Sequence, residues 1–271
     1  MSQEKFLNEK VAEWLGLQGY PLEMKVASTL RNSGFLVQHS AHYVDPETSK
    51  SREIDIICTL HDQTGMAEIH FVIECKSTKK PWVIFSAEYT RENLNALQAF
   101  AITSKRAREF ITDNAQNLYD SLTWVVKKGR VGYSITQAFA EGQDITYEAT
   151  LSAVKASVSL YNENESQKIY KTPFFFAFPV IVTASPLFEC YLDQVGNVNV
   201  QEIQEGTFYF DGKIENFSGT CIRVVSDSAL GTFKNDIHDI SEYLLTLLKE
   251  DIETEWINWQ KRANSAQTDV T

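Results

Sequence analysis

The chain has 271 residues, of which 43% are hydrophobic and 23% are charged, and its formal net charge is −11. This length allows a sizeable core without disulfides or a structural metal, and the composition is typical of a globular protein. The acidic charge argues against a protein that coats nucleic acid by charge alone, because phosphate binding needs clustered Lys and Arg. The first thirty residues have no apolar signal segment, and the longest apolar run, at 174–184, is too short to span a bilayer. We therefore expect a cytoplasmic protein with no membrane partner.

The first third of the chain predicts two helices followed by three strands. Residues 3–16 have a weak helical period, and a second helix is expected from Pro21 to about Asn32, before the helix-ending Gly34. The expected strands lie at 35–44, 52–60 and 68–76. A hairpin turn at 62–65 joins the last two strands, so they are expected to be neighbours in a sheet.

The rest of the chain first predicts helices and then strands. Residues 87–118 and 134–160 have mainly helical patterns, with a short strand at 123–127 between them. Further strands are expected at 174–183, 187–193, 198–203, 207–210 and 221–225. An amphipathic helix at 236–259 follows. The whole order indicates a mixed α/β fold.

Two of the predicted strands each carry an acid in an apolar setting. Asp55 lies among β-branched residues, and Glu74 lies in a run that is apolar on both faces. A hairpin in suitable register would place the two carboxylates side by side, where they repel unless a proton or a cation lies between them. A divalent cation with oxygen ligands fits this arrangement, since Mg²⁺ typically takes one or two carboxylates plus waters and substrate phosphate. The carbonyl oxygen of Cys75 could be another ligand.

A lysine and a further acid could join this pair. Side chains alternate along a strand, so Glu74 and Lys76 share a face, and Lys76 could partner a buried carboxylate. Glu23 lies on the second predicted helix, on the same side as Val26 and Leu30. If that helix packs on the hairpin, Glu23 faces the same pocket.

At this point the residues resemble the PD-(D/E)xK nuclease superfamily, and in particular its type IV restriction enzyme-like members. The resemblance covers about residues 19–85 and is carried by Glu23, by Ile54-Asp55 and by Glu74-Cys75-Lys76. Ile54 stands where the family has a proline, a change that leaves the metal ligand intact. The resemblance implies a restriction-endonuclease-like core, with a helix, a three-stranded meander, a helix and a fourth strand.

The run at 174–183 is the candidate for that fourth strand, beside the third. We expect a single nuclease domain over 1–271. Its expected parts are core motifs in 19–85, a helical insertion at 90–170, a β-rich extension at 171–235 and a C-terminal helix at 236–259. The alternative is a compact nuclease at 1–130 followed by a separate β-rich module at 171–271.

The resemblance also implies roles for the site residues. Asp55 and Glu74 would hold Mg²⁺ or Mn²⁺ together with the Cys75 carbonyl, and a bound water would become a nucleophile. Lys76 would orient that water and stabilise charge in the transition state. Glu23 would bind a second metal or a metal-bound water.

The expected substrate is nucleic acid, with DNA favoured over RNA. Lys79 and Lys80 directly follow the third strand and are candidates for phosphate contacts. The acidic net charge suggests that a protein partner or a homo-oligomer directs the substrate, as in an effector of a bacterial defence system. Two alternatives stay open. One is a catalytically inactive nuclease-fold module that binds nucleic acid or protein, and the other is a buried Asp55–Lys76 ion pair beside a solvated Glu23.

Overall fold

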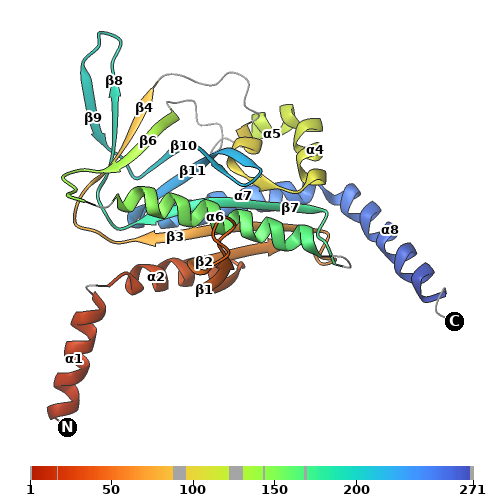
Figure 1. Ribbon diagram of the computed structural model, residues 1–271, viewed down its shortest axis with the longest axis horizontal. Helices are drawn as coiled ribbons and strands as arrows, with labels where there is room; N and C mark the ends of the chain where they lie inside the picture. The colour runs from red at the N-terminus through yellow and green to blue at the C-terminus, as the bar shows by residue number, and fades with distance from the viewer. Residues whose placement is uncertain are drawn as a thin grey trace.

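The computed structural model describes residues 2–16, 18–87, 96–121, 131–142, 144–167 and 170–268. These residues form a mixed α/β fold of eight α-helices around one eleven-stranded sheet (Figure 1). The helices are α1 (Ser2–Gly16), α2 (Tyr20–Arg31), α3 (Ala96–Phe100), α4 (Lys105–Asp113), α5 (Ala115–Ser121), α6 (Ile145–Ser166), α7 (Leu230–Leu247) and α8 (Lys249–Thr268).

The strands follow the order β1-β2-β3-β7-β11-β10-β6-β4-β8-β9 across the sheet, and β5 also pairs with β7. Their bounds are β1 (Leu36–Val44), β2 (Ser51–His61), β3 (Ala67–Lys76), β4 (Trp82–Ala87), β5 (Ile102–Thr103), β6 (Val131–Gln137), β7 (Phe174–Thr183), β8 (Leu187–Leu192), β9 (Val198–Glu202), β10 (Glu205–Ile214) and β11 (Phe217–Ser226). The β8–β9 hairpin rises from the body at one end, and α1 and α8 extend away from it in Figure 1.

The helix and three strands expected at the start of the chain are confirmed. Pro21 lies in the first turn of α2, and the chain leaves the helix through Gly34, whose φ of +88° favours glycine. Strands β1, β2 and β3 form an antiparallel meander. The run at 174–183 is β7, and it pairs in parallel with β3 along its whole length, next to the third strand as predicted.

The middle of the chain differs from the prediction. The expected helix at 134–160 overlaps β6, and α6 begins only at Ile145, because the side chain of Asp144 caps it by accepting the N–H groups of Thr146 and Tyr147. The region 90–170 contains β5 and β6 as well as helices. A Cβ on Gly132 in β6 would lie 2.4 Å from Cγ2 of Ile84, so this strand needs a glycine that weakens its sequence pattern.

Three further differences concern single elements. Strand β4 was not predicted, and the expected helix at 236–259 is two helices, α7 and α8, which meet at Leu248. The predicted helix at 87–118 contains the strand β5 between α3 and α4. The predicted strand at 123–127 lies outside the described residues.

Strand β7 changes partner along one of its edges. Its β3 edge is continuous, whereas its other edge pairs with β5 at 176–177 and with β11 from Val180 onward. Phe174 donates its backbone N–H to the carbonyl oxygen of Met66 on the β3 side. The carbonyl oxygen of Phe175 accepts the backbone N–H of Ser104 on the β5 side. By alternation, the nitrogen of Pro179 points to the second edge, at the step between β5 and β11. A proline is tolerated in this central strand because no ladder bond is required there.

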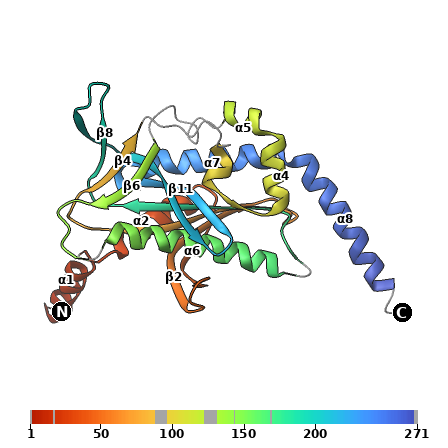
Figure 2. The same ribbon diagram turned by 45° about the horizontal axis from the view of Figure 1, so that its top comes forward.

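Helices cover both faces of the sheet, which buries β3 and β7 almost completely. One face packs against α6, through residues such as Ala149, Val154 and Val158. The opposite face packs against α2, α4 and α7, through residues such as Leu30 and Phe233. Figure 2 shows α6 and α7 on opposite sides of β7.

A buried ionic cluster fixes the β1–β2 turn to α6. Asp45 is fully buried and accepts hydrogen bonds from Arg52 Nε at 2.6 Å and from Lys155 Nζ at 3.2 Å. Burial opposes ionisation of Asp45, but the hydrogen bonds from the Glu47 N–H, from Lys155 and from the Thr48 N–H outweigh it and lower its pKa to about 2. The turn is therefore held by charge as well as by backbone pairing.

Two general properties complete the description. Within the ranges that the structure describes, no helix has both the length and the apolar character needed to cross a membrane. Cys58, Cys75 and Cys221 are buried, in keeping with their apolar strand settings, while Cys190 is half-buried.

Candidate active site

The ladder between β2 and β3 ends one residue before the two predicted acids meet. Its last pair is Ile56 with Ile73, and Asp55 and Glu74 follow on the two strands. Beyond that pair, Oδ2 of Asp55 accepts the backbone N–H of Cys75 at 2.6 Å. A side-chain carboxylate thus takes the place of a backbone acceptor, and the two strands are joined through it.

The neighbouring strand β1 is also irregular at this level. Its register with β2 passes from His39–Ile56 to Ala41–Ile54 without a pair at Asp55. Ser40, which stands opposite Asp55, has a φ of 47°, an uncommon left-handed conformation for a residue other than glycine. Regular pairing is therefore interrupted on both sides of Asp55, and the backbone of β1 is strained at Ser40, as is common near functional positions.

Glu74 and Lys76 lie together on one face of β3, as strand alternation predicts. Oε1 of Glu74 lies 2.5 Å from Nζ of Lys76, and Glu74 is only 5% exposed. The second carboxylate oxygen, Oε2, is buried and has no hydrogen-bond partner among the described residues. A buried carboxylate oxygen without a partner is costly, so this position favours a proton or a bound cation.

The charges of this cluster act on one another. Burial raises the pKa of Glu74 to about 7, the negative charge of Asp55 adds to the rise, and Lys76 opposes it. Burial also raises the pKa of Asp55, against the hydrogen bond from Cys75. Burial alone would lower the pKa of Lys76, but Glu74 outweighs it, so this pKa is raised and the ammonium stays charged. An added positive charge is therefore favoured between the two acids.

Glu23 reaches the same cluster from the first turn of α2. Its side chain is half-buried, and its pKa is raised first by burial and then by the charges of Asp55 and Glu53. A Cβ on Gly19 would lie 3.2 Å from Oε1 of Glu23, so the carboxylate folds back over the start of its own helix. The structure thus brings all four predicted residues together: Glu23, Asp55, Glu74 and Lys76.

The donor set is suited to a hard divalent cation, although it is small. In the part of the chain that the structure describes, no three His, Cys, Asp or Glu side chains are arranged to hold a metal ion by themselves. Mg²⁺ does not require three, because it keeps several waters and is bound by one or two carboxylates plus substrate phosphate. The unpartnered Oε2 of Glu74 beside Asp55 fits that mode of binding. The Cys75 carbonyl as a ligand stays a prediction.

The two lysines after β3 have different environments. Lys79 is exposed. Lys80 is also exposed, but its Nζ donates to the carbonyl oxygen of Phe139 at 2.7 Å. The structure therefore places Lys79 at the surface near the end of β3 and ties Lys80 to the turn after β6.

Sequence reasoning missed a polar network that supports this end of the sheet. Thr78 exchanges hydrogen bonds with Ser185 just beyond β7, with 2.7 Å between their hydroxyl oxygens, and Gln137 Nε2 donates to Thr78 Oγ1 at 2.8 Å. The network joins the segment after Lys76 to the ends of β6 and β7. Its members are common polar residues that are far apart in sequence, so no local pattern indicates their contact.

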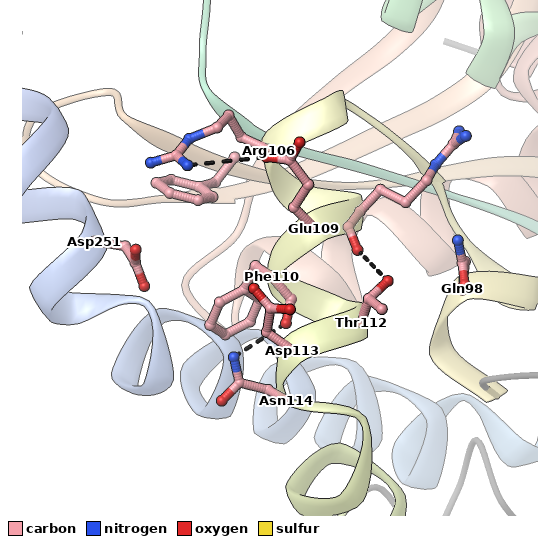
Figure 3. Close-up of a pocket in the computed structure, with 10 residues that line it drawn as sticks. Gln98, Arg106, Glu109, Phe110, Thr112, Asp113, Asn114 and Asp251 are labelled. Carbon is pink, nitrogen blue, oxygen red and sulfur yellow. Dashed lines mark hydrogen bonds and ion pairs between the residues drawn. The ribbon is translucent and has the colours of Figure 1, made fainter.

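A separate hollow lies elsewhere and shares no residue with the four-residue cluster. Figure 3 shows this pocket of about 410 Å³, with α4 on one side and Asp251 of α8 on the other. Arg106 faces it and forms an ion pair with Glu255 of α8 at 2.7 Å. Acidic and basic groups alternate around the hollow, and it contains neither of the strand acids.

Comparison with known proteins yields no relative for this chain. No protein-family model, no curated protein sequence and no solved structure matches it. The functional argument therefore depends on the geometry of the cluster and on the resemblance of its motifs.

Proposed function

We propose that the protein is a metal-dependent nuclease whose centre is formed by Asp55, Glu74, Lys76 and Glu23. The observation that carries the proposal is the buried, unpartnered Oε2 of Glu74, next to Asp55 and to the ammonium of Lys76. Glu165, in its ion pair with Lys171, also has a buried oxygen without a partner, so the distinguishing feature of Glu74 is the second acid, Asp55, whose charge adds to the raised pKa. A site for a cation and a phosphate accounts both for the carboxylate oxygen without a partner and for the lysine beside it.

The order of elements supports a restriction-endonuclease-like core. Helix α2 and the β1–β2–β3 meander come first, α6 and β7 come later after β4, α3, β5, α4, α5 and β6, and β7 lies beside β3. This is the sequence of helix, meander, helix and fourth strand that the motif resemblance implies. The acids lie where β2 and β3 part, at the end of the sheet from which the chain leaves β3.

The chemistry follows from the residues present. Asp55 and Glu74 would hold Mg²⁺ or Mn²⁺, which supplies a Lewis acid to a phosphate oxygen and lowers the pKa of a bound water. Lys76 would stabilise the negative charge that develops as the water oxygen bonds to phosphorus and the bond to the leaving sugar oxygen breaks. Glu23 would orient the attacking water by accepting a hydrogen bond from it. The attacking water gives up one proton to solvent, and the leaving oxygen takes one proton from solvent.

The substrate we propose is DNA, and the net charge of −11 favours help from a partner or from a second copy in binding it. An effector in a bacterial defence system would meet this description. Mg²⁺ binding to the carboxylates would also reduce the negative charge that substrate phosphates face at the site itself.

A cleavage assay tests the proposal. Purified protein is incubated with plasmid DNA, single-stranded DNA and RNA in the presence of Mg²⁺, Mn²⁺ or EDTA. We expect cleavage with a divalent cation, none with EDTA, and a loss of roughly a hundredfold or more in Asp55→Ala and Lys76→Ala. Glu202→Ala is the control, because Glu202 is an exposed acid on β9, at the opposite edge of the sheet from the β1–β2–β3 meander.

Two outcomes would contradict the proposal. Equal cleavage by the wild type, Asp55→Ala and Lys76→Ala would exclude this site. Absence of cleavage, together with absence of Mn²⁺ binding by calorimetry, would favour a nuclease-fold module that only binds nucleic acid or protein.

A further inference from the structure

The turn after β6 is attached to the segment that leaves the candidate site. Trp82 and Gln137 are register partners in β4 and β6, and Ala138 donates its N–H to the carbonyl of Pro81 at 2.8 Å. Gln137 also bonds to Thr78, two residues after Lys76. Residues 138–142 therefore leave the sheet at the same end as Lys76.

Phe139 projects from this turn into solvent. Its side chain is 82% exposed, and its φ of 56° is a conformation that a bulky L-residue rarely adopts. No ring–ring contact involves it in the described part of the chain. A bulky residue other than glycine with a positive φ is uncommon, and such strained positions concentrate at functional sites.

Lys80, in the segment that leaves the candidate active site after β3, holds Phe139 in this conformation. Its Nζ donates to the carbonyl oxygen of Phe139 at 2.7 Å, across 59 residues of sequence. The contact pins the backbone at the residue whose φ is positive. The side chain of Phe139 is thus presented by a fixed turn, and Lys80 acts on it as a positioning residue.

We propose that Phe139 is a stacking platform for an unpaired nucleobase next to the bond to be cut. This inference rests on the proposed nuclease function. Exposed aromatic rings bind single-stranded nucleic acid by stacking on base faces, and a Phe ring offers no hydrogen bond with which to read an edge. The preferred substrate is therefore a single-stranded or unpaired segment with little sequence selectivity, and Lys79 remains exposed nearby for its backbone.

Other exposed aromatic side chains do not have this combination of features. Tyr133 makes a ring contact with Phe85 at 6.4 Å, and Tyr170 makes one with Trp259 at 6.3 Å. Neither has a positive φ. Tyr170, which is 73% exposed, serves as a matched control for loss of an exposed ring.

Binding to single-stranded DNA that carries 2-aminopurine tests the inference apart from cleavage. All proteins carry Glu74→Gln, so that the probe stays intact while its fluorescence reports base stacking. We expect Phe139→Ala to weaken binding by about 5- to 100-fold and to abolish the fluorescence change. Phe139→Trp should retain both, and Tyr170→Ala should bind like the parent. Lys80→Met should weaken the fluorescence change, because the turn loses its anchor.

The failure of this inference is distinguishable from failure of the nuclease proposal. If the wild type cleaves DNA but Phe139→Ala binds the probe with unchanged affinity and fluorescence, the stacking role is refuted and the nuclease stands. Equal affinity of the parent for blunt duplex and for single-stranded DNA would also overturn the unpaired-base preference. Circular dichroism of each variant verifies that the fold is retained.

Discussion

Oδ2 of Asp55 accepts the backbone N–H of Cys75 at 2.6 Å, at the point where the pairing of β2 with β3 stops. One oxygen of this acid therefore has a structural role. The carboxylate charge, by contrast, is available to a cation and raises the pKa of Glu74. These two functions of one side chain can be separated by substitution.

We expect Asp55→Asn to keep the fold and lose the chemistry. Its amide oxygen can still accept from Cys75, so the melting temperature should stay close to that of the wild type, while cleavage should fall about a hundredfold or more. Asp55→Leu should lower the free energy of unfolding by about 1–3 kcal/mol, because the Cys75 N–H is left without an acceptor. Urea unfolding and cleavage rates of both variants test this. A stability loss in Asp55→Asn as large as in Asp55→Leu would contradict it.

Glu74 should make the metal-free protein less stable as pH rises. Its pKa is about 7 in the folded state against an ordinary value of 4.5, so the folded state retains the proton more strongly. The stabilisation is fully present below pH 4.5 and is lost as pH rises to about 7, a difference of about 3 kcal/mol. Urea unfolding in EDTA at pH 5 and pH 8 should show this loss in the wild type relative to Glu74→Gln.

The same pair of proteins gives the control. Mg²⁺ or Mn²⁺ at pH 8 should raise the melting temperature of the wild type, since binding to the folded state stabilises it, and should leave Glu74→Gln unchanged. Identical pH profiles for the two metal-free proteins would show that Glu74 is not buried in the way described.

Glu23 should contribute less than the strand acids. Its side chain is half-buried and reaches the cluster from a helix, and its proposed role is to orient water rather than to hold the metal. We expect Glu23→Gln to reduce cleavage by roughly tenfold while Mn²⁺ affinity, measured by calorimetry, changes only a few-fold. A loss of Mn²⁺ binding as complete as in Asp55→Asn would instead make Glu23 a principal ligand.

The Asp45 cluster should stabilise the protein at all but very acidic pH. The pKa of Asp45 is lowered to about 2 from 3.8, so its contribution is present above pH 3.8 and is lost as pH falls through about 2. Asp45→Asn should lower the free energy of unfolding at pH 7 by about 3 kcal/mol, because Lys155 loses a buried counter-charge. Lys105→Ala, which removes an exposed ion pair with Glu109, should cost less than about 1 kcal/mol. Equal losses in the two variants would contradict the cluster's role.

The strands that carry the acids could be predicted because their patterns are local. Asp55 and Glu74 each interrupt a run of apolar residues, and a short turn joins the two runs. The turn predicts that the two strands pair, and alternation along each strand predicts the face on which each acid lies. The side of β3 on which Glu74 and Lys76 lie was predicted for the same reason. The distortion at Ser40 and the Asp55–Cys75 hydrogen bond depend on contacts between strands and had no such signal.

Strands β4 and β6 could not be recognised in the same way. Gly132 weakens the pattern of β6, yet it is needed because Ile84 of β4 and Phe208 of β10 leave no room for a side chain. Each strand is defined by partners that come from distant parts of the chain. Strand β7 was predicted with Pro179 inside it, and the change of partner from β5 to β11 explains why a proline is tolerated there.

That change of partner has a consequence for synthesis of the protein. Strand β3 carries Glu74 and is held by β7, but β7 gains its second long neighbour only from β11, at 217–226. Phe233 and Ile237 of α7 then complete the core against α2. A nascent chain on the ribosome thus carries its acids long before it has the frame that holds them in place. Truncated products that end before β11 would retain Asp55, Glu74 and Lys76 without the neighbouring strand and helix that hold β7 and β3 in place.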